Sequence, residues 1–244
     1  MKLTRKLIPA MIMLLVSAVL MSTASFAWFA MNDTVTATGM KVTAKSDAVF
    51  LQISGDDGST YDYEYAHSDP AKELLPVAHD SFGSKADIQP SAGKWFYQYS
   101  NNKANSAADS VFGKNVVAEG NFENYVYKLT YKFKLAADSA SSTAYDLHVS
   151  SISLPATEGV KVIVEGPDGY YEFEAADTDG IAWGETGATV LANTVAKSGE
   201  TEVNVYIYID GANTNVTTDK LDASFFANLD PVDIGFKVYT QDHT

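Results

Sequence analysis

Residues 125–135, YVYKLTYKFKL, decide the fold class of this chain. Successive side chains of a β-strand point to opposite faces, so this stretch has one apolar face and one polar face. The apolar face carries Tyr125, Tyr127, Leu129, Tyr131, Phe133 and Leu135, and the polar face carries Lys128, Thr130, Lys132 and Lys134. The pattern predicts a half-buried antiparallel strand, with a protein core on one side and water on the other.

Further short stretches with strand character lie on both sides of this one. Apolar or alternating runs predict strands over residues 40–44, 48–53, 94–99, 147–154, 160–164, 170–173, 203–209 and 232–238. The tetrapeptide GPDG at 166–169 predicts a tight hairpin turn between two of them. Residues 101–121 are rich in Asn, Ala, Ser and Gly and predict a long surface loop.

Two connections carry helix signals. Asp69 and Pro70 can begin one or two helical turns over 69–75, and Thr218 can cap a short helix that Pro231 ends. The chain shows no repeat period and no domain break. We therefore predict one all-β domain over residues 40–244, a jelly-roll-like two-sheet sandwich with short helices in its connections.

The N-terminus has the features of an export signal. Three positive charges within the first six residues precede an uncharged apolar run over 7–21, and small residues follow. Ser25 and Ala27 occupy the −3 and −1 positions of a small-x-small site, which predicts a signal peptide over 1–27 that a signal peptidase cuts after Ala27. Cutting after Ala24 is one alternative. An uncleaved anchor is another, because the uncharged run continues to Met31 and is long enough to span a bilayer.

Composition narrows the class of protein and its partners. Removing residues 1–27 leaves about 217 residues, and the loss of their three positive charges moves the net charge from −14 to −17. So negative a chain argues against nucleic acid or anionic lipid as a partner, because their phosphates would repel it. There is no cysteine, so the exported domain must be held by its core without disulfides. The only membrane contact that we expect is through the signal before cleavage.

The sequence contains no recognisable set of catalytic or metal-binding residues. The four histidines, His67, His79, His148 and His243, have no metal-ligand spacing, and there is no GxSxG elbow, phosphate-binding glycine loop or cysteine nucleophile. For His148, flanked by strand residues, we expect an outward-facing or hydrogen-bonded ring. These observations predict a protein that is not an enzyme and has no cofactor.

Two further features leave a binding function open. Acidic groups at 56–64 and 177–179 include Asp56, Asp57, Asp62, Glu64, Asp177 and Asp179. They could offer oxygens to calcium, although the EF-hand pattern is missing and such clusters are usually solvated turns. Tyr206 and Tyr208 lie opposite the Val203/Ile207 face of their strand, as an exposed or second-core aromatic pair. A monomeric surface module that binds glycan or calcium is therefore an alternative function.

Residues 28–39 form an apolar, Thr-rich arm ahead of the first strand of the body. Its apolar members are Trp28, Phe29, Met31, Val35 and Ala37. Alternation slips at Thr38-Gly39, which predicts a bulge or hinge between arm and body. An extended segment can complete the edge of a sheet. The arm either pairs with its own domain or reaches the next molecule, where a head-to-tail contact produces a filament.

The junction AWFAMNDTVTATGMKVTAK over 27–45 resembles the start of mature TasA/camelysin-type proteins of Firmicutes, which are substrates of a SipW-type signal peptidase. The later stretches VNVYIYIDGANTN (203–215) and VDIGFKVYT (232–240) are similar to the distal part of such domains. The specific likeness covers about residues 20–45, and the remainder agrees mainly in strand pattern.

The resemblance implies a jelly-roll subunit of extracellular fibres in a biofilm matrix or on the cell surface. In that family the N-terminal arm enters a neighbouring subunit as a donor strand, which would fall on residues 28–39 of this chain. Camelysins are also described as metalloproteases. No zinc motif is present in this sequence, so that activity is not implied.

Signal-peptide cleavage fixes the N-terminus of the exported protein. Mass spectrometry of the protein recovered outside the cell should find an N-terminus at Trp28, because Ala27 ends the small-residue cluster that a signal peptidase requires. Replacing Ala27 with a bulky residue, as in Ala27→Leu, should reduce that species, whereas Ala30→Leu, three residues beyond the cut, should not. Exported protein that retains residues 1–27 would contradict the prediction.

Overall fold

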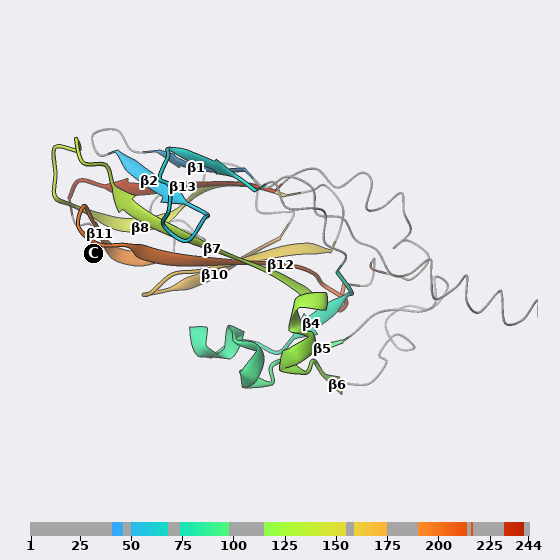
Figure 1. Ribbon diagram of the computed structural model, residues 1–244. Helices are drawn as coiled ribbons and strands as arrows, with labels where there is room; N and C mark the ends of the chain where they lie inside the picture. Colours follow the sequence, from blue (N-terminus) through green and yellow to red (C-terminus); the bar gives the residue numbers. More distant parts are fainter. Residues whose placement is uncertain are drawn as a thin grey trace, which may run out of the picture.

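Figure 1 shows a computed structural model of the chain. The structure describes residues 41–45, 50–67, 74–97, 115–154, 159–174, 190–213, 216 and 232–241. Two five-stranded sheets lie face to face, and a smaller three-stranded sheet sits beside one end of the lower of the two in this view (Figure 1).

Sheet A has the strand order β11-β8-β13-β1-β3. The bounds of these strands are Ala192–Ala196 (β11), Thr143–Ser153 (β8), Asp233–Tyr239 (β13), Lys41–Lys45 (β1) and Glu64–Ala66 (β3). The neighbours are antiparallel with one exception, since β1 runs parallel to β13 with Lys41 opposite Asp233. A parallel pair cannot be joined by a tight hairpin, and these two strands come from opposite ends of the chain.

Sheet B has the strand order β10-β9-β12-β7-β2, and every neighbouring pair is antiparallel. The bounds are Tyr170–Glu174 (β10), Val160–Glu165 (β9), Thr201–Ile209 (β12), Val126–Leu135 (β7) and Leu51–Ser54 (β2). Sheets A and B meet along one side through backbone hydrogen bonds in both directions between Ile53 and Asp62, with N–O distances of 2.7 and 3.0 Å.

The main core fills the space between the two sheets. From sheet B it receives alternate residues of β12 and β7, including Val203, Val205 and Phe133, all with no exposed surface. From sheet A it receives residues such as Phe236, whose ring centroid lies 4.8 Å from that of Phe133. Apolar burial of this kind is the dominant favourable term in folding, and here it must act without disulfides.

A third layer, which we call the cap, consists of residues 74–97 and 115–125. Its sheet has the order β4-β5-β6, with bounds Val77–His79 (β4), Trp95–Tyr97 (β5) and Asn115–Val116 (β6). Three 3-10 helices complete it, with bounds Lys85–Ile88 (η1), Pro90–Ala92 (η2) and Glu119–Asn124 (η3). The cap is joined to the end of β12 through a hydrogen bond from Gly211 N to Val77 O of 2.9 Å.

A second core lies between the cap and the outer face of sheet B. The cap contributes Val77, Ile88, Trp95, Val117 and Phe122, and sheet B contributes Val126, Ile163, Tyr206 and Tyr208. Alternation along β12 therefore serves two cores, since its odd-numbered residues face sheet A and two of its even-numbered residues face the cap. This is why β12 is buried on both faces over part of its length.

The GPDG turn fixes the side of the sandwich where β10 and β11 lie. Gly166 N donates to Gly169 O at 2.8 Å, which closes the hairpin between β9 and β10. Asp168 then holds the start of β11, because its backbone N donates to Leu191 O at 2.9 Å and its carboxylate accepts from Asn193 N at 2.8 Å. A Cβ added at Gly166 would lie 2.2 Å from Leu191 O, so no side chain fits there.

The sequence prediction of an all-β two-sheet sandwich is confirmed, and so is the GPDG hairpin. The strand over 125–135 is observed from Val126, and that at 94–99 is observed over Trp95–Tyr97, with 98–99 outside the described residues. The strands predicted at 147–154, 160–164, 170–173, 203–209 and 232–238 are also present. The expected loop over 101–121 is wrong at its end, where β6 and the start of η3 lie. The β3, β4 and β11 strands and the cap as a layer were not predicted.

Several predicted features lie outside the described residues. These are the signal peptide, the arm over 28–39, the Thr38-Gly39 bulge, most of the helical turns at 69–75 and the helix after Thr218. Of the predicted strand at 48–53, the part from Leu51 is observed as β2.

Gly166→Ala should destabilise the domain. The added methyl group must displace the Leu191 backbone, and overpacking of this kind typically costs about 1–3 kcal/mol. Thermal unfolding followed by circular dichroism should show a melting temperature lower by several degrees. Gly199→Ala is the matched control, because a Cβ at Gly199 meets no atom within 4 Å. Equal melting temperatures for the two variants would contradict the prediction.

Candidate functional site

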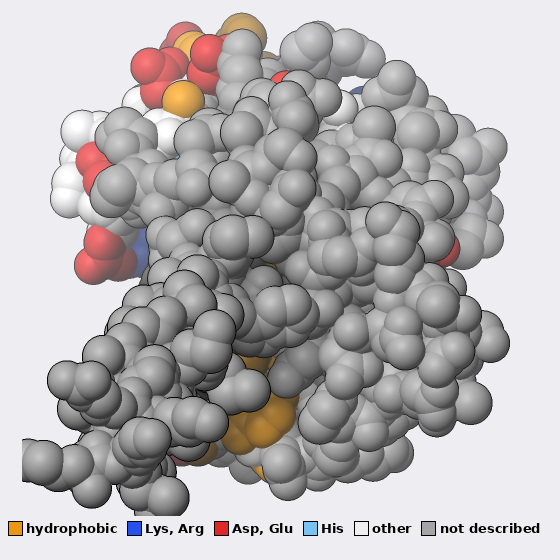
Figure 2. All heavy atoms as spheres, turned by 90° about the vertical axis from the view of Figure 1, so that its right-hand side faces the viewer, with side chains coloured by type: hydrophobic (Ala, Val, Ile, Leu, Met, Phe, Trp, Pro, Cys, Tyr) orange, Lys and Arg blue, Asp and Glu red, His pale blue; other side chains and the backbone are white. Residues whose placement is uncertain are grey.

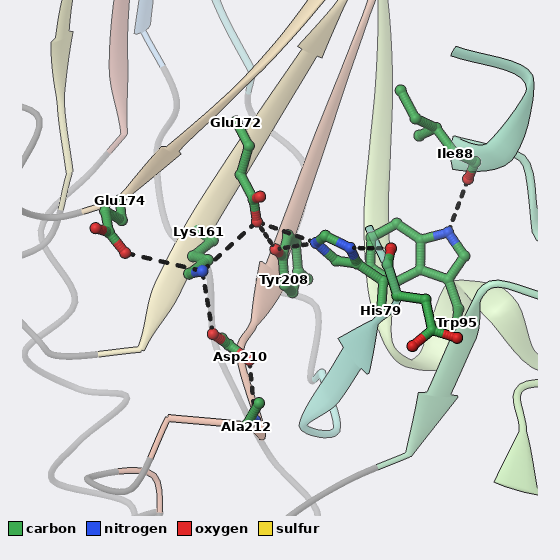
Figure 3. A network of polar contacts seen from close by, with 10 residues as sticks. His79, Ile88, Trp95, Lys161, Glu172, Glu174, Tyr208, Asp210 and Ala212 are labelled. Carbon is green, nitrogen blue, oxygen red and sulfur yellow. Dashed lines mark hydrogen bonds and ion pairs between the residues drawn. The ribbon is translucent and has the colours of Figure 1, made fainter. Parts of the chain in front are cut away.

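The most elaborate group of polar side chains in the described part of the chain lies where the cap meets sheet B (Figure 3). It contains His79 at the end of β4, Lys161 of β9, Glu172 of β10, Tyr208 of β12, and Asp210 just after β12. We call this group the His79 network. Four strands from separate parts of the sequence are needed to assemble it.

His79 is the cap's contribution to the network. Its Nδ1 lies 2.9 Å from Asp80 O, and its Nε2 lies 3.1 Å from Glu172 Oε1 and 2.8 Å from the Tyr208 hydroxyl. A backbone carbonyl can only accept, so Nδ1 carries a proton, and a protonated Nε2 can donate to the carboxylate. The ring also stacks on Phe82, with centroids 4.1 Å apart, and meets Trp95 at an angle of 63°.

Glu172 is the acceptor at the centre of the network. Burial by itself would raise the pKa of this carboxyl, but hydrogen bonds from His79 and Tyr208, together with the positive charge of Lys161, lower it to about 2. Tyr208, only 1% exposed, donates its hydroxyl proton to Glu172. Burial, and then the negative charge of Glu172, raise the pKa of Tyr208 well above its usual value. Glu172 is therefore a carboxylate and Tyr208 a neutral phenol over the ordinary pH range.

Lys161 balances the negative charges. Its Nζ lies 3.2 Å from Asp210 Oδ2, 3.7 Å from Glu172 Oε1 and 3.8 Å from Glu174 Oε2. Burial opposes the charged form of this amine, but the nearby carboxylates of Asp210 and Glu172 outweigh it and raise its pKa. An amine held in its charged form is a poor nucleophile or base. The polar groups of the network are hydrogen-bonded or ion-paired to one another. These contacts join the cap to sheet B, as expected of a structural role.

A second polar group lies under an open groove of about 440 Å³ on the outer face of sheet B. It is lined by Lys85, Glu165, Gly166, Pro167, Glu200, Thr201, Glu202 and Asn204. Glu165, only 8% exposed, accepts a hydrogen bond of 2.7 Å from the Tyr206 hydroxyl. Longer contacts of 3.4 Å reach the same oxygen from Gln89 and Asn204. Glu165 thus ties the cap to β12 in the same manner as Glu172.

The acidic turn after β2, considered above for calcium, is held by its own hydrogen bonds. Asp56 accepts from Ser54 Oγ at 2.5 Å and from Thr60 N at 2.9 Å, and these bonds lower its pKa to about 2. Asp57 pairs with Lys132 at 2.8 Å. Within the described residues, no three His, Asp or Glu side chains are arranged to hold a metal ion. Asp177 and Asp179 lie outside them.

The histidines and tyrosines that the sequence singled out have varied places. His148 is buried, with Nδ1 2.7 Å from Asp146 O, so the hydrogen-bonded interpretation is confirmed; burial lowers its pKa. His67 packs at an angle against the ring of Tyr131. Tyr206 and Tyr208 form the second-core pair rather than the exposed one. His243 lies outside the described residues.

The residues predicted for processing and assembly cannot be placed. Ser25, Ala27, Trp28, Phe29, Met31, Val35 and Ala37 all lie outside the described residues. The His79 network was missed by sequence reasoning, since its members lie at positions 79, 161, 172, 208 and 210 with no motif spacing. One sequence signal pointed toward the cap: the alternation along 203–209 places Tyr206 and Tyr208 on the face opposite the main core.

Comparison with known proteins adds no family assignment. No protein-family model matches the chain, and no curated protein or solved structure matches it significantly. No helix within the described ranges is long and apolar enough to cross a membrane.

Glu172 should make the domain acid-sensitive. Its folded pKa of about 2 lies below its ordinary value of 4.5, so its contribution to stability is complete above pH 4.5 and is lost as the pH falls toward 2. Glu172→Gln should lower the free energy of unfolding at pH 7 by about 1–3 kcal/mol. Its difference from the wild type should then shrink between pH 4.5 and 2, as measured by urea denaturation at each pH.

Glu119→Gln is the matched control, because Glu119 is an exposed glutamate of the cap. It should keep the wild-type stability and pH profile. A constant difference between wild type and Glu172→Gln at all pH values would show that Glu172 does not titrate as its contacts imply.

Proposed function

We propose that this chain is a secreted structural subunit of extracellular fibres, in a biofilm matrix or on the cell surface, that assembles by donating its N-terminal arm to a neighbouring copy. In this proposal a signal peptidase first removes residues 1–27. The arm over 28–39 then becomes the start of the mature protein.

The observation that carries the proposal is the position of β1. This strand lies between β13 and β3 and runs parallel to β13, so it enters sheet A without a hairpin from its parallel neighbour. The arm lies just before Met40 and β1 in the chain, and its apolar side chains, including Trp28, Phe29, Met31, Val35 and Ala37, are too few to build a core of its own. An extended segment of this kind gains stability when it completes a sheet.

The sandwich also has sheet edges that could accept such a segment. Among the described strands, none pairs with the outer side of β10 or of β11, and β3 has β1 as its one strand neighbour. Unpaired backbone groups along an edge are a template for an added strand. When the added strand comes from a second copy, donor and acceptor surfaces differ, so the contact repeats without closing and forms a filament.

The strong negative charge is compatible with this role. Repulsion between like-charged subunits opposes random aggregation, so a specific contact is needed to bring copies together. Figure 2, which views the molecule from the right-hand side of Figure 1, shows acidic side chains in several groups at the surface. Screening by salt weakens this repulsion, and fibre formation should therefore become easier as ionic strength rises.

Electron microscopy of purified protein that begins at Trp28 should show filaments. Val35→Asp should abolish them, because Val35 lies on the face of the arm that would fill the acceptor groove, and a buried unpaired charge is costly. Thr36→Asp is the matched control, since its side chain points to the opposite face of an extended arm. Persistent monomers of the wild-type protein, unaffected by either change, would contradict the proposal.

A further inference from the structure

Two large hydrophobic side chains stand together at the surface near the start of β2 and β3. Phe50 is 46% exposed and Tyr63 is 44% exposed, and their rings meet edge to face with centroids 6.3 Å apart. Val116 in the cap is the only other strongly exposed large hydrophobic residue among those that the structure describes. We call Phe50 and Tyr63 the aromatic pair. Single exposed apolar residues are common, but adjacent exposed aromatic rings are typical of contact surfaces.

Tyr63 and the first residue of β1, which the arm precedes in the chain, lie toward opposite ends of the β1–β3 pair. β1 is antiparallel to β3, with Lys41 opposite Ala66 and Thr43 opposite Glu64. Tyr63 precedes Glu64, so it lies toward the end of β1, whereas the arm joins β1 at its start. β3 ends at Ala66, opposite Lys41, so the first residue of β1 lies at the end of this strand pair that is away from Tyr63.

This arrangement is the one that a head-to-tail contact requires. In such a contact each copy offers one end to the opposite end of the next copy. The thirteen residues from Trp28 to Met40 can extend over about 40 Å, so the tip of the arm can reach well beyond its own domain. The arm begins with Trp28 and Phe29, and large aromatic side chains supply much of the energy of protein contacts.

We propose that the aromatic pair is the docking site for the tip of the arm, residues 28–31, of a second copy of this chain. The inference rests on the proposed function and names the surface at which the donated arm ends. In an extended arm Phe29 and Met31 point to the same face, so both can pack against Phe50 and Tyr63. Tyr61, two residues before Tyr63 in the chain, has Lys134 Nζ over its ring at 3.5 Å from the centroid.

A photo-cross-linking experiment tests the site. The mature chain is prepared with Tyr63→p-benzoylphenylalanine, mixed in equal amounts as unlabelled and ¹⁵N-labelled protein, allowed to assemble, and irradiated. Mass spectrometry should find cross-links from position 63 to residues 28–31, including mixed-isotope pairs that only a contact between copies can produce. Cross-links to the arm with no mixed-isotope pairs would show that each arm covers its own aromatic pair, which overturns the proposal.

Substitution of the pair gives a second readout. Phe50→Ser with Tyr63→Ser should raise the concentration needed for fibre formation by at least about tenfold, the equivalent of about 1.4 kcal/mol per contact. Val116→Ser is the matched control, because it removes an equally exposed apolar side chain from the cap. Circular dichroism should show that all three proteins remain folded, so that a loss of fibres reports the contact.

The outcomes separate this inference from the proposed function. Wild-type fibres with no cross-link to residues 28–31, or fibres unaffected by the double substitution, would overturn the aromatic pair as docking site and leave arm donation standing. Wild-type protein that forms no fibres and no cross-links between copies at any concentration would overturn both.

Discussion

The structure depends on how the two buried tyrosine hydroxyls of β12 are satisfied. Tyr206 and Tyr208 face the cap, and each donates to a glutamate of a different strand, Glu165 of β9 and Glu172 of β10. A buried hydroxyl without a partner would cost more than the hydrogen bond itself is worth. With both carboxylates in place, β12 can be buried on both faces, and the cap can cover sheet B.

Two other aromatic side chains of the second core also have hydrogen-bond partners for their polar groups. Trp95 Nε1 donates to Ile88 O at 2.8 Å, and the Tyr170 hydroxyl donates to Phe82 O at 2.9 Å. These bonds let large aromatic side chains fill the space between cap and sheet without unpaired polar atoms. In a chain that has no cysteine, this second core offers a means of holding an additional layer that does not depend on oxidising conditions.

The proposed assembly places different demands on the two ends of the sandwich. At the cap end, aromatic packing and the His79 network fix the layers to each other, so this part of the molecule is suited to remain unchanged during assembly. At the other end, Phe50 and Tyr63 are exposed, although their neighbours Leu51 and Ile53 are fully buried in the main core. Exposed rings on a rigid support bind with little loss of conformational freedom, which favours a specific contact over a diffuse one.

The sequence by itself determined the longer strands and which of their faces enters the main core, because period-two alternation records which face of a strand is buried. Residues 126–135 and 203–209 show this, and the GPDG turn needed no tertiary information to be recognised. Alternation does not state what covers a polar or aromatic outer face. The cap, the Tyr206–Glu165 and Tyr208–Glu172 pairs and the His79 network were therefore decided only by the tertiary structure. Their members lie up to 131 positions apart, from His79 to Asp210, and they meet because strand pairing and layer packing bring them together.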